Sequence, residues 1–308
     1  MIGLDSNCMS TSDGQITYSF PIGGKEFAEN AKWVARSIKK HCSDPHIVVG
    51  IRPEEREEIS DSVLEEVKDI VDDFIEIERP REEYPISIKI ENLVRAAKIS
   101  DRDFIVHLDS DVLVMSDLTK LIPETRNQGW MKVKEVDFGA QYWGGTESEK
   151  DWKYLFDEIG EEYPGRIFNS TIDDRDIPPF FNAGFVMAPN TDFANDWLEM
   201  TKLVWDNFET PYSDQIALGL LSMRYDRKVL TNKNSLNLPG SLYVPTKIDV
   251  LRYEEIYHLL RLSNPLVIKK VLDLGLNPYS YFNMIEIPKK IQQSLNMYRH
   301  LNNILQVR

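Results

Sequence analysis

An apolar segment that contains two carboxylates constrains the fold of this chain more than any other feature. Residues 104–114 read Phe-Ile-Val-His-Leu-Asp-Ser-Asp-Val-Leu-Val, and this aliphatic, β-branched composition predicts a buried β-strand. Burying a charged group away from water costs free energy, so Asp109 and Asp111 are expected at the end of the buried strand, where water or a ligand can reach them. If the strand frays into a turn at Ser110, the two carboxylates can converge on one ligand.

The spacing of the two carboxylates predicts a metal site. Residues two apart on an extended strand face the same side, with Cα atoms roughly 6.5–7 Å apart, so Asp109 and Asp111 can converge on one cation. Mg²⁺ and Mn²⁺ take oxygen ligands and are commonly shared between carboxylates and substrate phosphates. The motif thus indicates a diphosphate ligand, and the structural alternative is an acidic turn at a strand end.

Strand and helix patterns alternate before this segment. Strands are predicted over residues 16–20, 46–51 and 73–77, and helices over residues 25–41, 53–70 and 86–99. This alternation predicts an α/β fold with a parallel sheet that binds ligands beyond the carboxyl ends of its strands. The sequence after the first strand contains no GxGxxG, which argues against a dinucleotide-binding Rossmann domain.

The second half of the chain is less regular. Between residues 119 and 180, glycines and prolines separate aromatic residues such as Trp143, which predicts an insertion of loops and short helices on the acceptor side. We expect a catalytic domain over residues 1–262, followed by a basic, apolar helical tail over 263–308. Residues 256–308 hold seven basic and two acidic residues, so the tail could lie on an anionic membrane surface or pack on the domain or a second subunit.

Composition narrows the function classes. The net charge of −14 argues against nucleic acid as a partner, because phosphate binding needs a basic surface. Cys8 and Cys42 are too few for a disulfide framework. The N-terminal residues lack the pattern of a signal peptide, and no apolar run reaches about 18 residues. These features predict a cytoplasmic protein, with peripheral membrane contact as a further possibility.

Two later motifs complete a family resemblance. The motifs are Phe-Phe-Asn-Ala-Gly-Phe at 180–185 and Ser-Asp-Gln-Ile-Ala at 213–217. Following the Asp109–Asp111 strand and preceding His258, they resemble the GT-A fold glycosyltransferases, most closely the retaining glycogenin-like and lipopolysaccharide-galactosyltransferase-like group. The resemblance covers about residues 17–258 and implies a mostly parallel, twisted sheet flanked by helices. It also implies transfer of a hexosyl group from a nucleotide diphosphate sugar, with UDP the expected nucleotide, to a glycan, lipid-linked or protein acceptor.

The same resemblance assigns roles to individual residues. The implied ligands of Mn²⁺ or Mg²⁺ are Asp109, Asp111 and His258. The residues expected to face the donor sugar are Asn182, Asp214 and Gln215. The residues expected to hold the nucleotide are Tyr18, Ser19, Pro21, Lys89, Asp109 and Ser110. An asparagine amide can donate hydrogen bonds to sugar hydroxyls and accept hydrogen bonds from them. A carboxylate at Asp214 would cap the helix predicted over 214–223 in any case.

Two alternatives stay open at this point. Retention at the anomeric carbon needs no strong general base from the protein, whereas inversion needs a carboxylate base opposite the leaving group. For that base the candidates are Asp173, Asp174 and Asp176. The non-enzymatic alternative is a pseudo-glycosyltransferase or sugar-binding module that keeps the fold without turnover.

Overall fold

The computed structural model of the 308-residue chain describes residues 15–77, 84, 87–110, 112–114, 117–122, 130–135, 148–169, 176–229, 235–236 and 256–258. Several predictions concern positions outside the described residues. They are the helical tail over 263–308, the side chain of Asp111, the aromatic loop around Trp143, and the loop residues Asp173 and Asp174.

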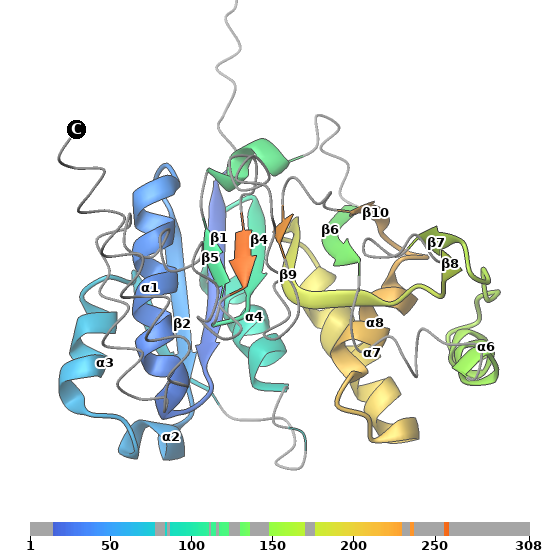
Figure 1. Cartoon of the computed structure of the whole chain (residues 1–308), viewed down its shortest axis with the longest axis horizontal. Coiled ribbons are helices and arrows are strands. Elements are labelled where there is room, and N and C mark those ends of the chain that lie inside the picture. Colours follow the sequence, from blue (N-terminus) through green and yellow to red (C-terminus); the bar gives the residue numbers. More distant parts are fainter. Residues whose placement is uncertain are drawn as a thin grey trace, which may run out of the picture.

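A seven-stranded sheet forms the centre of the protein (Figure 1). Its strands lie in the order β10 (Asp226–Val229), β6 (Trp130–Glu135), β9 (Phe181–Pro189), β4 (Phe104–Leu108), β1 (Ile16–Ile22), β2 (His46–Ile51) and β3 (Asp73–Glu76). Strand β9 pairs antiparallel with β4 and β6, and each of the other pairs is parallel. The mostly parallel α/β sheet that the sequence predicts is confirmed.

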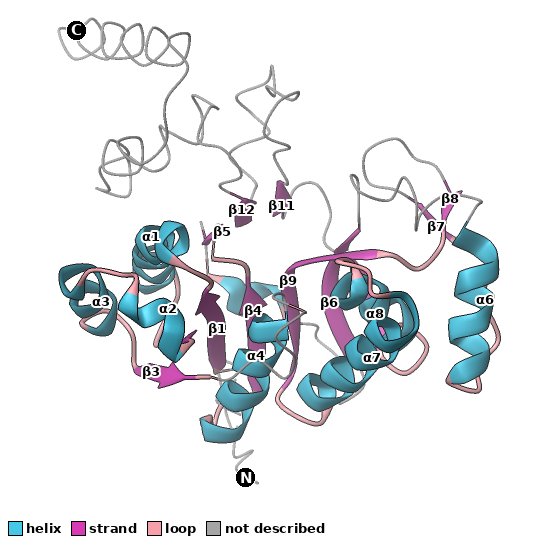
Figure 2. Cartoon of the chain, turned by 90° about the horizontal axis from the view of Figure 1, so that it is seen from below, coloured by secondary structure: helices cyan, strands magenta, loops and turns pink. Residues whose placement is uncertain are grey.

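Helices cover both faces of this sheet (Figure 2). One apolar cluster joins the sheet to α1 (Lys25–His41) and α3 (Asp61–Lys68). A second cluster joins the opposite face to α4 (Ser87–Ile99), α7 (Phe193–Phe208) and α8 (Ser213–Leu221). None of the described helices is both long and apolar enough to cross a bilayer.

Strand β4 contributes side chains to both clusters. Phe104, Val106 and Leu108 lie in the α1 cluster, whereas Ile105 lies in the α4 cluster. Successive side chains of a strand point to opposite faces, so His107 shares the α4 face with Ile105. Its edge contact with the Trp197 ring of α7, at 5.6 Å between centroids, agrees with this placement.

The predicted strand over 104–114 is divided by a turn at Ser110. Strand β4 ends at Leu108, the main-chain N–H of Val112 donates to the carbonyl of Asp109 (3.2 Å), and β5 (Val112–Val114) follows. Strand β5 belongs to a separate three-stranded sheet with β12 (Ile256–His258) and β11 (Ser235–Leu236). Asp109 therefore lies where the chain leaves the central sheet, as expected.

The helix prediction over 53–70 is wrong. The structure has two helices there, α2 (Pro53–Glu57) and α3, because Ser60 adopts an extended conformation and its carbonyl accepts the first amides of a new helix.

The prediction that residues 119–180 form an insertion is also wrong in part. The range is not only an insertion, since β6 is a strand of the central sheet. Its central residues, Met-Lys-Val-Lys at 131–134, alternate apolar and charged side chains as a strand does. The rest of the described range contains η1 (Leu118–Leu121), α6 (Glu149–Glu158), and the short pair β7 (Phe168–Asn169) and β8 (Asp176–Ile177).

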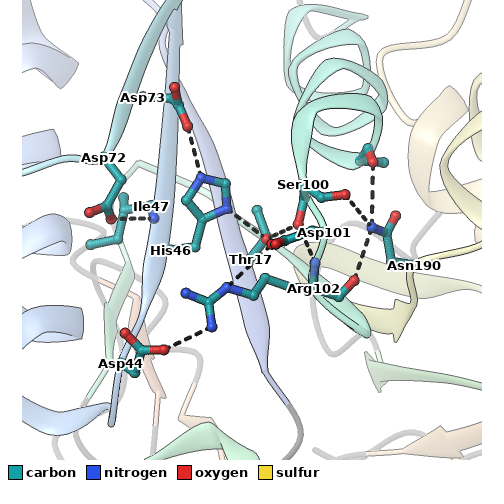
Figure 3. Close-up of polar contacts among 11 residues, drawn as sticks. Thr17, Asp44, His46, Ile47, Asp72, Asp73, Ser100, Asp101, Arg102 and Asn190 are labelled. Carbon is teal, nitrogen blue, oxygen red and sulfur yellow. Dashed lines mark hydrogen bonds and ion pairs between the residues drawn. The ribbon is translucent and has the colours of Figure 1, made fainter.

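Polar contacts hold the amino edge of the sheet together (Figure 3). The imidazole of His46 contacts Thr17 Oγ1 through Nδ1 (2.9 Å) and Asp73 Oδ2 through Nε2 (2.8 Å), which links β1, β2 and β3. After β9, Asn190 Nδ2 donates at 3.1–3.4 Å to three carbonyls, that of Ala97 in the last turn of α4 and those of Ser100 and Arg102 in the segment before β4. This edge lies opposite the carboxyl ends of the parallel strands.

The contacts of Asn190 predict a stability cost for its removal. Asn190→Ala leaves these three carbonyls without their shared donor, so we expect a loss of about 1–3 kcal/mol in the free energy of unfolding, measured by urea denaturation. The exposed Asn207, whose Nδ2 donates to the Leu203 carbonyl of its own helix, provides a matched control, and Asn207→Ala should cost about 0.5 kcal/mol or less. Equal losses in the two variants would contradict this account of the amino edge.

Candidate active site

Four chain segments meet at the carboxyl edge of the sheet. Strand β4 ends there, β9 begins there because it runs antiparallel to β4, and helices α4 and α8 have their first turns there. Each segment brings one of the predicted site residues, namely Asp109, Asn182, Lys89 and Asp214. The candidate active site is therefore built around these four side chains.

Lys89 links two of the carboxylates. Its ammonium forms an ion pair with Asp214 Oδ2 and lies 3.6 Å from Asp109 Oδ1. The side chain of Lys89 is 13% exposed, that of Asp214 1% and that of Asp109 35%. Burial of the ammonium lowers the pKa of Lys89, but the charges of Asp109 and Asp214 outweigh this effect and raise it above its ordinary value. The site thus holds a permanent cation.

Asp214 is fixed through its main chain. Its N–H donates to the hydroxyl of Tyr84 (3.2 Å), and its carbonyl accepts from Trp197 Nε1 (2.9 Å). The N-cap position of α8 is Tyr212, so the predicted capping role of Asp214 is wrong. Its buried Oδ1 makes no hydrogen bond with any described residue. A buried acceptor of this kind is expected to have a partner, and a ligand hydroxyl could supply one.

An irregularity in β9 positions Asn182. Strand β6 pairs Val133 with Val186 but the next residue, Lys134, with Asn182, so residues 183–185 bulge out of this ladder. Within the bulge, Asn182 Oδ1 accepts the N–H of Gly184 (2.9 Å), and the carbonyl of Gly184 accepts the N–H of Asp109 (3.0 Å). Asn182 therefore lies inside β9 and not in a turn before it. With its oxygen engaged, its NH₂ group is the part that can serve a sugar hydroxyl.

The three predicted metal ligands come from adjoining backbone segments. Asp109 follows β4, Asp111 immediately precedes β5, and His258 in β12 pairs with Val112 of β5. Carboxylate oxygens with an imidazole suit Mn²⁺, so the donor types fit the implied cation. Among the described residues alone, no group of three His, Cys, Asp or Glu side chains could hold a metal ion, and Asp111 lies outside them.

The predicted nucleotide contacts in β1 are part of the core. Tyr18 is 1% exposed and lies in the α1 cluster, where burial raises the pKa of its phenol. Ser19 faces α4, and its Oγ accepts from Asn92 Nδ2 (2.9 Å). Pro21 is also buried. Their burial argues against direct base stacking by Tyr18 and against ribose binding by Ser19. The other predicted residues, Ser110 and Gln215, follow Asp109 and Asp214 directly.

Sequence reasoning missed three residues of this site. The imidazole of His107 is fully buried, and its Nε2 lies 3.4 Å from Asp109 Oδ1. Burial lowers the pKa of His107 below its ordinary value of 6.5. The spacing of two that relates Asp109 to Asp111 also relates His107 to Asp109, and that signal could have found it. Tyr84 and Trp197 contact Asp214 only through the tertiary fold, so the sequence carries no local signal for either.

The sheet, with its antiparallel strand β9 and its flanking helices, has the GT-A fold. The chain is similar in structure to the galactosyltransferase LgtC in complex with donor and acceptor sugar analogues (TM-score 0.52, 15% identity, 84% of this chain and 95% of LgtC covered). An active-site mutant of LgtC also has a TM-score of 0.52, at 14% identity, with 85% of this chain and 95% of the mutant covered. The apo form of the glycosyltransferase GlyE of Streptococcus pneumoniae has a TM-score of 0.51, at 15% identity, with 88% of this chain and 62% of GlyE covered.

The chain belongs to the Rhodobacterales glycosyltransferase domain family, whose model matches residues 22–226. No curated protein matches it in sequence. Family and fold together establish a transferase enzyme, as the resemblance of its motifs implies.

The buried ion pair generates a prediction about stability. Lys89→Met leaves Asp214 as an uncompensated buried charge, so we expect a loss of about 3–5 kcal/mol in the free energy of unfolding. The double variant Lys89→Met/Asp214→Asn should recover part of this loss, because the unpaired charge is gone. Urea denaturation of the two single variants and the double variant measures the coupling.

Lys39 provides the matched control for the Lys89 variants. Its ammonium lies 3.0 Å from Asp72 in a pair whose side chains are 37% and 39% exposed. Solvent screens such a pair, so Lys39→Met should cost at most about 1 kcal/mol. If Lys89→Met costs no more than Lys39→Met, the charge of Lys89 does not hold Asp214 in place.

Proposed function

We propose that this glycosyltransferase moves a hexosyl group from a UDP-sugar to a hydroxyl of a glycan, lipid-linked or protein acceptor, with retention at the anomeric carbon. The observation that carries the proposal is the position of Lys89 between Asp109 and Asp214. This buried cation lies between the carboxylate of Asp109 at the end of β4 and the carboxylate of Asp214, whose Oδ1 has no hydrogen-bond partner among the described residues. A diphosphate on one side and a sugar on the other match that arrangement of charge.

Lys89 is assigned to the departing diphosphate. Its ammonium has three N–H donors, and its charge is fixed where negative charge grows as the glycosidic bond to the diphosphate breaks. Such preorganised charge acts in the transition state without a reorganisation cost. Asp109, Asp111 and His258 would hold Mn²⁺ or Mg²⁺, which when bound supplies further positive charge at the diphosphate.

Asp214 and Asn182 are assigned to the donor sugar. The Oδ1 atom of Asp214 can accept a hydrogen bond from a sugar hydroxyl, and the NH₂ group of Asn182 can donate one. The negative charge of Asp214 also favours the oxocarbenium character of the reacting sugar. Gln215, in the same turn of α8, is placed with them. LgtC, to which the chain is similar in structure, is a galactosyltransferase, and this supports a hexosyl group.

The described carboxylates favour retention over inversion. In the retaining scheme the bond from the anomeric carbon to the diphosphate breaks, the acceptor oxygen bonds to that carbon on the same face, and its proton passes to the diphosphate. Inversion instead requires a separate carboxylate base, but Asp109 and Asp214 are both ion-paired with Lys89. Asp176 is exposed in β8. NMR of the new linkage distinguishes the two schemes, and an inverted product would contradict ours.

The metal assignment predicts the effect of removing one carboxylate. Asp111→Asn should abolish Mn²⁺-dependent UDP binding, measured by isothermal titration, while the melting temperature stays equal or rises because a charge at a buried strand mouth is costly. In wild type, UDP with Mn²⁺ at a hundred times its Kd should stabilise the fold by about 2.7 kcal/mol. The control is Asp44→Asn, since Asp44 is an exposed acid at the amino edge (Figure 3).

Two outcomes would count against this assignment. Unaltered Mn²⁺-dependent binding in Asp111→Asn would remove Asp111 from the metal site. A wild-type protein that neither binds UDP nor hydrolyses any nucleotide sugar with Mn²⁺ would favour the non-catalytic, sugar-binding alternative.

A further inference from the structure

We infer that His107 is a positioning residue, whose imidazole fixes the orientation of the Asp109 carboxylate for the divalent cation. The inference rests on the proposed function, because it takes Asp109 as a metal ligand. It concerns a residue of the 104–114 segment to which neither the sequence motifs nor the family resemblance assigns a role.

The geometry places two groups on one oxygen of Asp109. His107 Nε2 lies 3.4 Å from Asp109 Oδ1, and Lys89 Nζ lies 3.6 Å from the same atom. One group comes from β4 itself and the other from α4, so they approach Oδ1 from different elements. Two groups that approach one oxygen from different directions favour one orientation of the carboxylate. Groups that hold a ligand in this way orient it for a metal.

His107 is enclosed on all sides by packed residues. Its side chain is fully buried, and the edge of the Trp197 ring packs against it. Its neighbours in the sheet are Ser19 on β1 and Val186 on β9. Trp197 also donates to the carbonyl of Asp214. His107 and Trp197 therefore join the Asp109 side of the site to the Asp214 side.

Packing alone does not account for an imidazole here. A neutral imidazole has one N–H, and the carboxylate of Asp109 requires it on Nε2. The buried Nδ1 is then an acceptor, and it makes no hydrogen bond with any described residue. An unpaired buried acceptor is costly, whereas phenylalanine or leucine would fill the space without one. The contact of the imidazole with Asp109 is what offsets the cost of this unpaired acceptor.

The direct test compares two replacements at this position. His107→Phe keeps a ring against Trp197 but removes the donor, whereas the side-chain amide of His107→Gln can still donate. We expect His107→Phe to weaken Mn²⁺ binding about 10–100-fold, measured by electron paramagnetic resonance of free Mn²⁺, and His107→Gln to bind close to wild type. In turnover, His107→Phe should raise the Mn²⁺ concentration for half-maximal rate, and saturating Mn²⁺ should restore much of kcat.

His46 is the matched control for these variants. It also contacts an aspartate through Nε2, but at the amino edge of the sheet (Figure 3), so His46→Phe should leave Mn²⁺ binding unchanged. A folded His107→Phe protein with wild-type Mn²⁺ affinity would overturn the inference. A wild-type protein that binds no Mn²⁺ would instead overturn the proposed metal site itself.

A measurement on the unmodified protein covers the case in which His107→Phe does not fold. Nitrogen-15 NMR of the histidine side chains should show the Nε2–H tautomer at His107. Its signals should shift on addition of MgCl₂ with UDP, while those of His46 stay in place. An Nδ1–H tautomer, or signals of His107 that do not respond while UDP and Mg²⁺ bind, would overturn the inference.

Discussion

The candidate site depends on one buried cation. Lys89 comes from α4, Asp109 from the end of β4 and Asp214 from α8, so a single ammonium joins three segments that are distant in the sequence. Without it, Asp214 would be a buried charge with no counter-ion in the part of the chain that the structure describes. Buried ion pairs add little net stability, because desolvation offsets their attraction. We therefore attribute this arrangement to the chemistry of the site and not to the stability of the fold.

The sheet determines where this cation finds its partners. Strand β4 turns Phe104, Val106 and Leu108 into the core on one face and His107 towards α4 on the other. Asp109 is the first residue beyond the ladder, and its N–H is held by the bulge of β9. The carboxylate at the edge and the histidine beside it thus follow from the register of β4 and the bulge of β9, whereas α4 supplies the lysine.

The sequence predicted those parts of the protein that local periodicity determines. The helix over Lys25–His41 and the strand over His46–Ile51 match their predicted bounds, and the turn at Ser110 follows from the cost of burying charge. Tertiary contacts decided the rest. The cluster that encloses Tyr18 forms only when α1 packs on β1, and Trp197 reaches the carbonyl of Asp214 only when α7 packs beside α8. Neither contact has a local sequence signal.

A crystal structure with Mn²⁺ and a non-hydrolysable UDP-sugar tests the central claim most directly. The account predicts that the diphosphate lies between the metal and Lys89, with the sugar against Asp214 and Asn182. A ligand bound at the amino edge, near His46 and Asp73, would contradict it. So would a diphosphate at the carboxyl edge that makes no contact with Lys89.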